Sequence, residues 1–260
     1  MKPVSKIFRT TTKHASISIV QNADCVELRS DTNALHSVVD LKNPQKLALK
    51  NLEYLMGVLL FIPAPQNILL LGTGGGSLIH FLRYHYPHSC LTSVDNDSEL
   101  QDLMQQKMLL PKASANLVYL IDEASHYLHH CEQHFDLILV DIFSGSQSPH
   151  WLLESTASHQ LYKLLTGGGA VAYNLLVDSD HDFKLFFENL SQVFNQQVLS
   201  LTIDGFENRL VYGFYSAPPR REMSYYIERA IAMTEIDDID YLSVLSTIYT
   251  TNPVGSAVIY

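Results

Sequence analysis

The 260-residue sequence contains little cysteine and no long apolar run. Its three cysteines, Cys25, Cys90 and Cys131, show no paired spacing, which fits reduced thiols in the cytosol. No apolar stretch approaches the roughly 20 residues of a membrane-spanning helix. The polar, basic residues 1–12 lack the apolar core of a signal peptide. We therefore expect a cytoplasmic protein with no membrane partner.

Charge is also scarce. Charged residues make up 17% of the chain, and the formal net charge is −10. Nucleic-acid binders need a basic face, so we expect no nucleic-acid partner. The acidic balance is compatible with a cationic substrate. A thinly charged surface is often covered by a second subunit, which favours a homodimer.

Residues 1–45 read as short strands and turns, with strands expected over 17–20, 25–28 and 38–41. Apolar residues at helical spacing predict a helix over 45–61, which Pro63 and Pro65 would end. From residue 67 onwards, apolar strands and helices alternate. This pattern predicts a doubly wound α/β sheet that binds ligands at the carboxyl ends of its strands.

The later elements are predicted from the same patterns. We expect parallel strands over 67–71, 90–94, 117–121, 135–140 and 170–174, and a closing antiparallel pair over 198–203 and 209–215. Helices are expected over 98–109, 124–131, 151–165, 183–194 and 222–248. The Gly167–Gly169 triplet is expected to stop the helix over 151–165.

A glycine cluster follows the first of these apolar strands and precedes a helix. The cluster is Gly72, Thr73, Gly74, Gly75 and Gly76, and all five are candidate ligand-binding residues. Such a loop brings backbone N–H groups close to a ligand, and the helix N-terminus adds a partial positive charge. Ser77 stands where the third glycine of a dinucleotide fingerprint would lie, which disfavours a nicotinamide-dependent oxidoreductase.

Carboxylates end the next three strands. Asp95, nineteen residues after Gly76, is a candidate for the ribose hydroxyls, with capping of the next helix as the alternative. Asp122, with its neighbour Glu123, is a candidate for the adenine amino group, again with capping as the alternative. Asp141 would face the open cleft, where it could bind a cationic group or act as a base.

These motifs, in this order, resemble the spermidine synthase-like (polyamine aminopropyltransferase-like) branch of the class I S-adenosylmethionine-dependent methyltransferase fold. The segments that carry the resemblance are 72–77, 94–97, 121–124, 135–141, 149–156 and 167–175, with the lead-in from residue 28 to 61. The resemblance implies a mostly parallel seven-stranded Rossmann-like sheet over residues 46–260 and a small N-terminal β-domain over 1–45. It also implies S-adenosylmethionine, or its decarboxylated form, as donor substrate, with no metal.

One position departs from the family in a way that bears on the chemistry. In aminopropyltransferases the strand-four acid belongs to an Asp-x-x-Asp motif whose second acid takes the proton from the attacking amine. Here that second position is Ser144, and a serine hydroxyl is no base without help. The resemblance favours a transferase that moves an aminopropyl or other alkyl group to an amine acceptor such as a polyamine, and Ser144 argues against the aminopropyl reaction. The alternatives are a methyltransferase and a non-catalytic nucleotide-binding or dimerising homologue.

Two polar clusters compete for a role. His126, His130 and His134 recur at four-residue intervals and could bind zinc on one continuous helix, although a solvated helix end is favoured. Asp178, Asp180 and Asp182 could attract a cationic substrate, although capping of the next helix is favoured.

Overall fold

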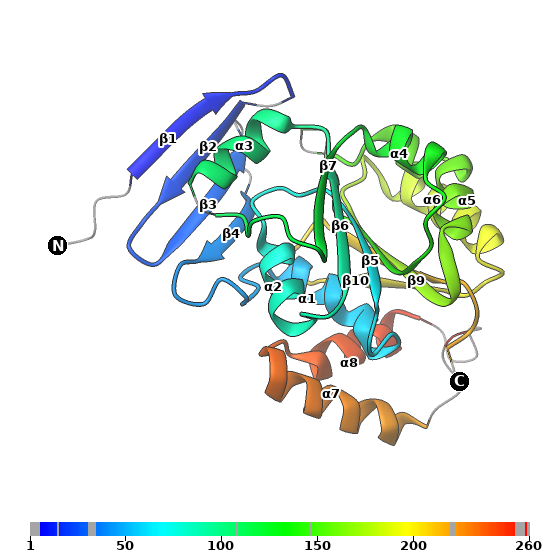
Figure 1. The fold of residues 1–260 in the computed structure, drawn as a ribbon. Coiled ribbons are helices and arrows are strands. Elements are labelled where there is room, and N and C mark those ends of the chain that lie inside the picture. Colours follow the sequence, from blue (N-terminus) through cyan, green and yellow to red (C-terminus); the bar gives the residue numbers. More distant parts are fainter. Residues whose placement is uncertain are drawn as a thin grey trace.

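A computed structural model describes residues 6–14, 16–30, 35–107, 109–145, 147–218, 222–252 and 258. These residues form a small antiparallel sheet at the N-terminal end and a larger sheet that is covered by helices on both faces (Figure 1). Among the described residues, no helix is both long and apolar enough to cross a lipid bilayer.

The small sheet is a four-stranded meander in which each strand pairs antiparallel with the next. Its strands are β1 (Lys6–Thr11), β2 (Ser16–Gln21), β3 (Cys25–Ser30) and β4 (Leu35–Asp40). Ile17 and Ile19 of β2 and Val26 and Leu28 of β3 are buried, whereas the residues between them are more exposed. Since side chains alternate along a strand, one face of this sheet joins the main core. The patterns identified three of the four strands and missed β1.

The larger sheet has seven strands in the order β10-β11-β9-β8-β5-β6-β7. The five strands from β9 to β7 run parallel, and β11 and β10 complete the other side of the sheet with antiparallel pairing. The expected mostly parallel, seven-stranded sheet with a reversed final pair is therefore confirmed. The strands are β5 (Asn67–Leu71), β6 (Cys90–Asp95), β7 (Leu117–Ile121), β8 (Phe135–Val140), β9 (Leu165–Leu175), β10 (Val198–Thr202) and β11 (Arg209–Phe214).

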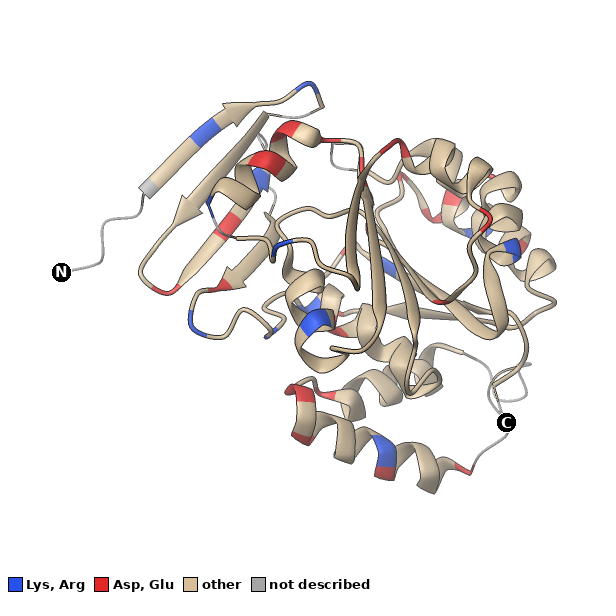
Figure 2. Cartoon of the chain, viewed as in Figure 1, with Lys and Arg blue, Asp and Glu red and all other residues tan. Residues whose placement is uncertain are grey.

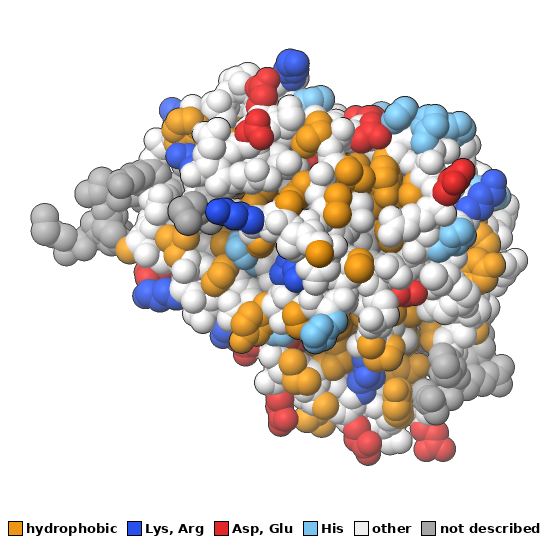
Figure 3. Space-filling view, viewed as in Figure 1, with side chains coloured by type: hydrophobic (Ala, Val, Ile, Leu, Met, Phe, Trp, Pro, Cys, Tyr) orange, Lys and Arg blue, Asp and Glu red, His pale blue; other side chains and the backbone are white. Residues whose placement is uncertain are grey.

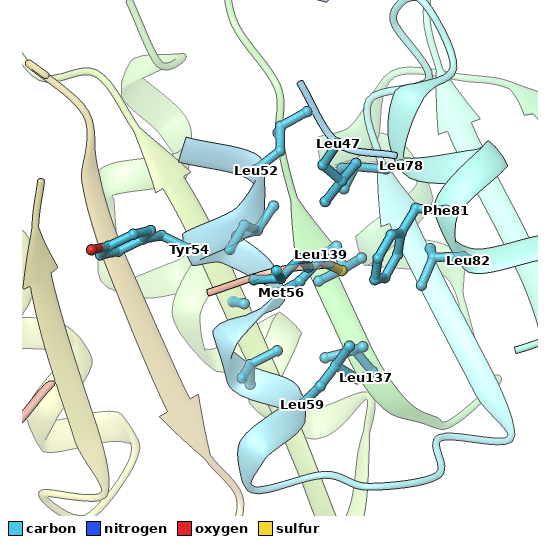
Figure 4. Packing of buried hydrophobic residues seen from close by; sticks show 14 of the residues in the cluster. Leu47, Leu52, Tyr54, Met56, Leu59, Leu78, Phe81, Leu82, Leu137 and Leu139 are labelled. Atoms are coloured by element: carbon cyan, nitrogen blue, oxygen red, sulfur yellow. The ribbon is translucent and has the colours of Figure 1, made fainter. Parts of the chain in front are cut away.

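Helices cover both faces of this sheet, which explains why its central strands are apolar throughout. Along β5, Leu69 and Leu71 pack with α4 (Ala124–His130), α5 (Ser155–Lys163) and α6 (Asp180–Val193). Ile68 and Leu70 face the opposite layer, which includes α1 (Lys50–Met56), η1 (Gly57–Leu60), α2 (Ser77–His85) and α3 (Ser98–Gln106). Figure 4 shows part of this second core, where leucines of the sheet meet Leu52 and Met56 of α1 and Phe81 of α2. A strand buried on both faces needs apolar side chains at every position.

The C-terminal tail is helical, as expected over 222–248, but it contains two helices rather than one continuous helix. They are α7 (Met223–Asp237) and α8 (Tyr241–Thr251). Asp238 ends α7 in a left-handed conformation with φ of 65°, and the Asp240 side chain caps α8 by accepting from Ser243 N. The guanidinium of Arg229 donates to two carbonyls of η1 and fixes α7 beneath the sheet (Figure 1).

Two further boundaries differ from expectation. The Gly167–Gly169 triplet lies inside β9, where the pairing with β8 shifts register between Phe135 and Leu137, so the glycines form a bulge rather than a helix stop. α1 begins at Lys50 rather than residue 45, because Leu49 is still extended. The segment before α5 is a separate 3₁₀ turn, η2 (His150–Leu153).

Candidate functional site

The glycine loop connects β5 to α2 at the carboxyl edge of the sheet and is tight on one side and open on the other. Gly72 has a φ of 100°, and a Cβ there would overlap the backbone carbonyl of Asp141 at the end of β8. Its N–H donates to Val94 O over 2.8 Å. Gly74 has a φ of 49°, and a Cβ there would meet no atom within 4 Å. The loop is thus wedged between β6 and β8 at its first glycine and presents free space at its second.

Asp95, at the end of β6, holds this loop. Its Oδ2 accepts from the N–H of Thr73 over 2.7 Å and of Gly74 over 3.3 Å, and its Oδ1 accepts from Asp97 N over 3.0 Å. The Thr73 hydroxyl lies 2.8 Å from the hydroxyl of Ser93. A carboxylate has about four lone-pair sites, so these three bonds leave little acceptor capacity. A ribose hydroxyl would have to share Asp95 with the loop, most easily by replacing the long bond to Gly74.

Asp122 and Glu123 follow β7, next to Asp95. Asp122 N donates to Asp95 O over 3.1 Å, which joins the two strand ends. The Asp122 carboxylate lies 2.9 Å from His126 Nδ1, one turn into α4. Glu123 accepts from the Asn96 amide over 2.7 Å. Figure 2 marks acidic residues in the loops that follow β6 and β7 in red. The structure therefore brings Asp95, Asp122 and Glu123 to one end of the cleft.

Asp141 lies at the end of β8, beside the first glycine of the loop. Burial raises the pKa of its carboxyl to about 6, and a hydrogen bond from Asn174 acts against that rise. Asn174 Nδ2 donates to Asp141 Oδ1 over 2.8 Å, and Asn174 Oδ1 in turn accepts from Asn208 Nδ2 over 2.8 Å. Asn174 is the next-to-last residue of β9, and Asn208 directly precedes β11. The carboxylate is thus held at the cleft by a chain of two amides.

Ser144 lies in the loop after Asp141 and bonds only through its backbone within the described residues. Its N–H donates to Gln147 O over 2.8 Å in a small antiparallel bridge. Between Asp141 and Ser144, the ring of Phe143 lies 6.4 Å from the ring of His36 on β4. Burial lowers the pKa of His36, so its ring is neutral at neutral pH. Phe143 and His36 therefore place an aromatic, uncharged contact beside Asp141.

The small sheet is attached to the site through hydroxyl groups. Ser37 on β4 lies 2.7 Å from the Ser77 hydroxyl, which also donates to Val38 O over 2.9 Å. Thr12, just after β1, donates to the N-cap carboxylate of α3, Asp97, over 2.5 Å. Ser77, which replaces a glycine of the dinucleotide fingerprint, thus anchors the N-terminal sheet to the start of α2.

Asp180 and Asp182 of the acidic cluster after β9 lie in the first turn of α6. Ser179 is the N-cap and accepts from Asp182 N over 3.2 Å, while its hydroxyl donates to the Asp182 carboxylate. Asp180 pairs with Arg209 at 2.5 Å. The expectation that these aspartates cap a helix beginning at residue 183 was wrong, because α6 begins at Asp180 and its cap is the hydroxyl of Ser179.

The histidines of α4 do not form a metal site in the described part of the chain, where no group of three potential ligands comes together. His130 Nδ1 lies 2.9 Å from the backbone carbonyl of His126, whose own ring faces Asp122. Figure 3 shows histidines gathered on the surface over α4. Two surface cavities, of about 350 and 450 Å³, flank α5 and neither includes the glycine loop.

Known proteins are similar in sequence to this chain over most of its length. The polyamine aminopropyltransferase of Neisseria meningitidis serogroup A is 28% identical over 238 residues, which cover 91% of this chain and 89% of that protein. The chain is a relative of the polyamine aminopropyltransferases. No protein-family model matches it.

Solved structures place this aminopropyltransferase relative in the same fold group. A probable spermidine synthase from Corynebacterium glutamicum superposes with a TM-score of 0.73 at 19% identity, covering 96% of this chain and 95% of that one. Human methyltransferase-like protein 13, solved in complex with SAH, superposes with a TM-score of 0.59 at 20% identity. The superposition covers 79% of this chain and 91% of that one. The resemblance seen in the sequence, a spermidine synthase-like chain with a class I methyltransferase-like fold, is confirmed.

Three residues at the candidate site of this chain have contacts that the sequence did not predict. The sequence offered one indication of Asn174, because it is a polar residue within the apolar run of β9. In the structure its side chain is 1% exposed. The sequence offered no indication of Asn208, since it lies in a polar loop 67 positions from Asp141. His126 was considered only as a metal ligand, although the four-residue spacing from Asp122 allows the contact that forms.

Proposed function

We propose that this chain is a transferase that binds S-adenosylmethionine or its decarboxylated form and moves an aminopropyl or other alkyl group to an amine. The observation that carries the proposal is the glycine loop, whose open second glycine lies between Asp95 on one strand end and Asp141 on another. The polyamine aminopropyltransferase relatives and the methyltransferase solved with SAH support an adenosyl sulfur ligand at this place.

In the proposed complex, Asp95 would accept from the ribose, and Asp122 and Glu123 would lie at the adenine. The backbone N–H groups of residues 72–76 would face the ligand. The space at Gly74 leaves the loop accessible, and the short side chain of Asp95 keeps the ribose close to it. These residues fit an adenosyl group because they supply acceptors for its hydroxyls and amino group at adjacent strand ends.

Asp141 would act on the acceptor. An amine nitrogen attacks the carbon next to the sulfonium, a C–N bond forms, and the C–S bond breaks with its electron pair going to sulfur. The amine loses a proton, which Asp141 would accept, since its pKa of about 6 leaves it ionised at pH 8. Alignment supplies much of the rate, because a sulfonium is already a good leaving group.

Methyl transfer is the second candidate, and Ser144 is the observation that favours it. Aminopropyl transfer in the family uses a second acid at this position, and among the described residues no hydrogen bond joins the hydroxyl of Ser144 to Asp141 or to a histidine. Methyl transfer needs less acid–base assistance. The two reactions share the donor site and differ in the carbon that is attacked.

Ligand-induced thermal stabilisation tests the donor site. S-adenosylmethionine, its decarboxylated analogue, methylthioadenosine and NAD are added separately, and the melting temperature is measured. A ligand at 100 times its Kd stabilises the folded state by about 2.7 kcal/mol, which is a shift of about 5–10 °C for a chain of this size. The absence of a shift with every adenosyl sulfur compound would contradict the proposal.

Two variants make the test specific. Asp95→Ala should abolish the shift, whereas Asp178→Asn, which changes an exposed acid at the same edge, should leave it unchanged. An unaltered shift in Asp95→Ala would show that the ribose assignment is wrong. Incubation with putrescine and the decarboxylated donor then separates the chemistries: spermidine indicates aminopropyl transfer, and binding without product leaves methyl transfer or a non-catalytic relative.

A further inference from the structure

The carboxyl of Asp141 does not stand alone: two amides from different parts of the chain lie behind it in line. Asn174 comes from β9, the neighbour of β8, and Asn208 comes from the β10–β11 connection. Both bonds are 2.8 Å, close to the ideal length for N–H···O. Asn174 is 1% exposed, so water cannot replace either of its partners at low cost.

The charge of Asp141 fixes the direction of the two hydrogen bonds that link Asn208, Asn174 and Asp141. An ionised carboxylate can only accept, so Asn174 must turn its NH₂ group toward Asp141 and its oxygen away from it. That oxygen needs a donor, and the NH₂ of Asn208 supplies it. A hydrogen bond accepted by an amide oxygen polarises the amide and strengthens the bond that its NH₂ donates. Asn208 therefore acts on Asp141 through Asn174.

Asn208 itself is held by the residues around it. Its neighbour Arg209 pairs with Asp180 at the start of α6 and lies over the ring of Phe183, 5.6 Å from the ring centroid. Arg209 also pairs with Leu175 in the β9–β11 ladder, one residue beyond Asn174. The start of α6 and the start of β11 thus fix the backbone next to the amide that orients the carboxylate.

We propose that Asn174 and Asn208 are positioning residues that form an amide relay, holding the Asp141 carboxylate in one orientation and in its ionised form. The catalytic meaning of this relay rests on the proposed function, but its effect on the carboxyl does not. The relay opposes the burial that drives the carboxyl toward its neutral form.

Other charged groups at this edge are engaged elsewhere in the described structure. Asp95 bonds the loop amides, and the remaining pairs are Asp122 with His126, Glu123 with Asn96, and Asp180 with Arg209. Ser179 donates to Asp182, Asp178 is exposed, and His36 lies against Phe143. The hydrogen bond from Asn174 is therefore the contact through which a neighbour most directly affects Asp141.

The test measures the titration of Asp141 in the ligand-free full chain. Aspartate carboxyl carbons are labelled with ¹³C, and Asp141→Asn identifies the resonance. Asn174→Ala should raise the apparent pKa of Asp141 by about one unit, because a hydrogen bond to a charged group is lost. Asn208→Ala should raise it by a smaller amount. Asn189→Ala, a half-buried asparagine on α6, is the matched control and should cause no change.

A double-mutant comparison distinguishes a relay from two separate effects. If Asn208 acts through Asn174, Asn208→Ala should cause no further shift in the Asn174→Ala background. An equal shift in both backgrounds, or no shift in Asn208→Ala alone, would overturn the relay. Asn208 is half-buried in a connection, so its variant should fold even if Asn174→Ala does not.

The donor experiment separates this inference from the proposed function. In the relay variants, the thermal shift with the adenosyl compounds should be unchanged, because neither asparagine contacts the loop or Asp95. If turnover is found, Asn208→Ala should move the acidic limb of the pH–rate profile upward while the KM for the donor stays the same. If no adenosyl compound binds but the titration shifts as described, the proposed function fails and the relay stands.

Discussion

The glycine loop makes a quantitative prediction, because the same substitution at two of its glycines should have different effects. Gly72 and Gly74 both have a positive φ, of 100° and 49°. An alanine in this conformation costs about 1–2 kcal/mol. At Gly72 the new methyl group would also overlap the carbonyl oxygen of Asp141, which is backbone and has no room to rotate away. Overpacking of this kind costs a further 1–3 kcal/mol or so.

We therefore expect Gly72→Ala to lower the free energy of unfolding by about 2–5 kcal/mol, and Gly74→Ala to lower it by about 1 kcal/mol. For a chain of this length these values correspond to a fall in melting temperature of about 10 °C for the first variant and about 3 °C for the second. Circular dichroism melts of the two variants and the wild type, at one protein concentration, measure both.

For donor binding we expect the opposite order: Gly74→Ala should impair binding more than Gly72→Ala, although it destabilises the fold less. The methyl group at Gly74 would project into the open side of the loop, so Gly74→Ala should remove most of the thermal shift with S-adenosylmethionine at little cost in stability. Equal falls in melting temperature for the two variants would refute the described loop geometry. A full ligand shift in Gly74→Ala would refute the position of the donor instead.

Three further predictions concern acids of the same sheet. Burial raises the folded-state pKa of Asp141 to about 6, above that of an unfolded carboxyl, so the wild type loses stability as pH rises through 6. In urea titrations, the free energy of unfolding of Asp141→Asn should exceed that of the wild type by about 3 kcal/mol at pH 8 and should nearly equal it at pH 4. If the chain lacks only the base for aminopropyl transfer, Ser144→Asp should raise the rate of spermidine formation by about tenfold or more. An unchanged rate in a variant that still binds the donor would point to methyl transfer. Asp136→Ala should cost about 2–3 kcal/mol in a melt, because Asn67 N and the Thr166 hydroxyl lose their acceptor, and a change below 1 kcal/mol would contradict that role.

Local patterns were sufficient for the elements of the larger sheet. The boundaries of β7 and β8 match the expected ranges, because apolar runs between helices have one stable placement, between two covering layers. The same patterns failed at the glycine triplet of β9 and at the tail, where the outcome depended on a bulge against β8 and on packing of α7 below η1. Neither contact has a signature in neighbouring residues.

For the site, the sequence by itself determined which residues reach the cleft. The glycine loop and the acids at 95, 122 and 141 all follow apolar strands, and parallel strands bring their carboxyl ends to one edge. Only the tertiary structure decided what each acid does before a ligand arrives: Asp95 holds the loop amides, and Asp141 is held by Asn174 and Asn208. Those partners are distant in sequence, because hydrogen bonds across a sheet depend on strand order rather than on spacing along the chain.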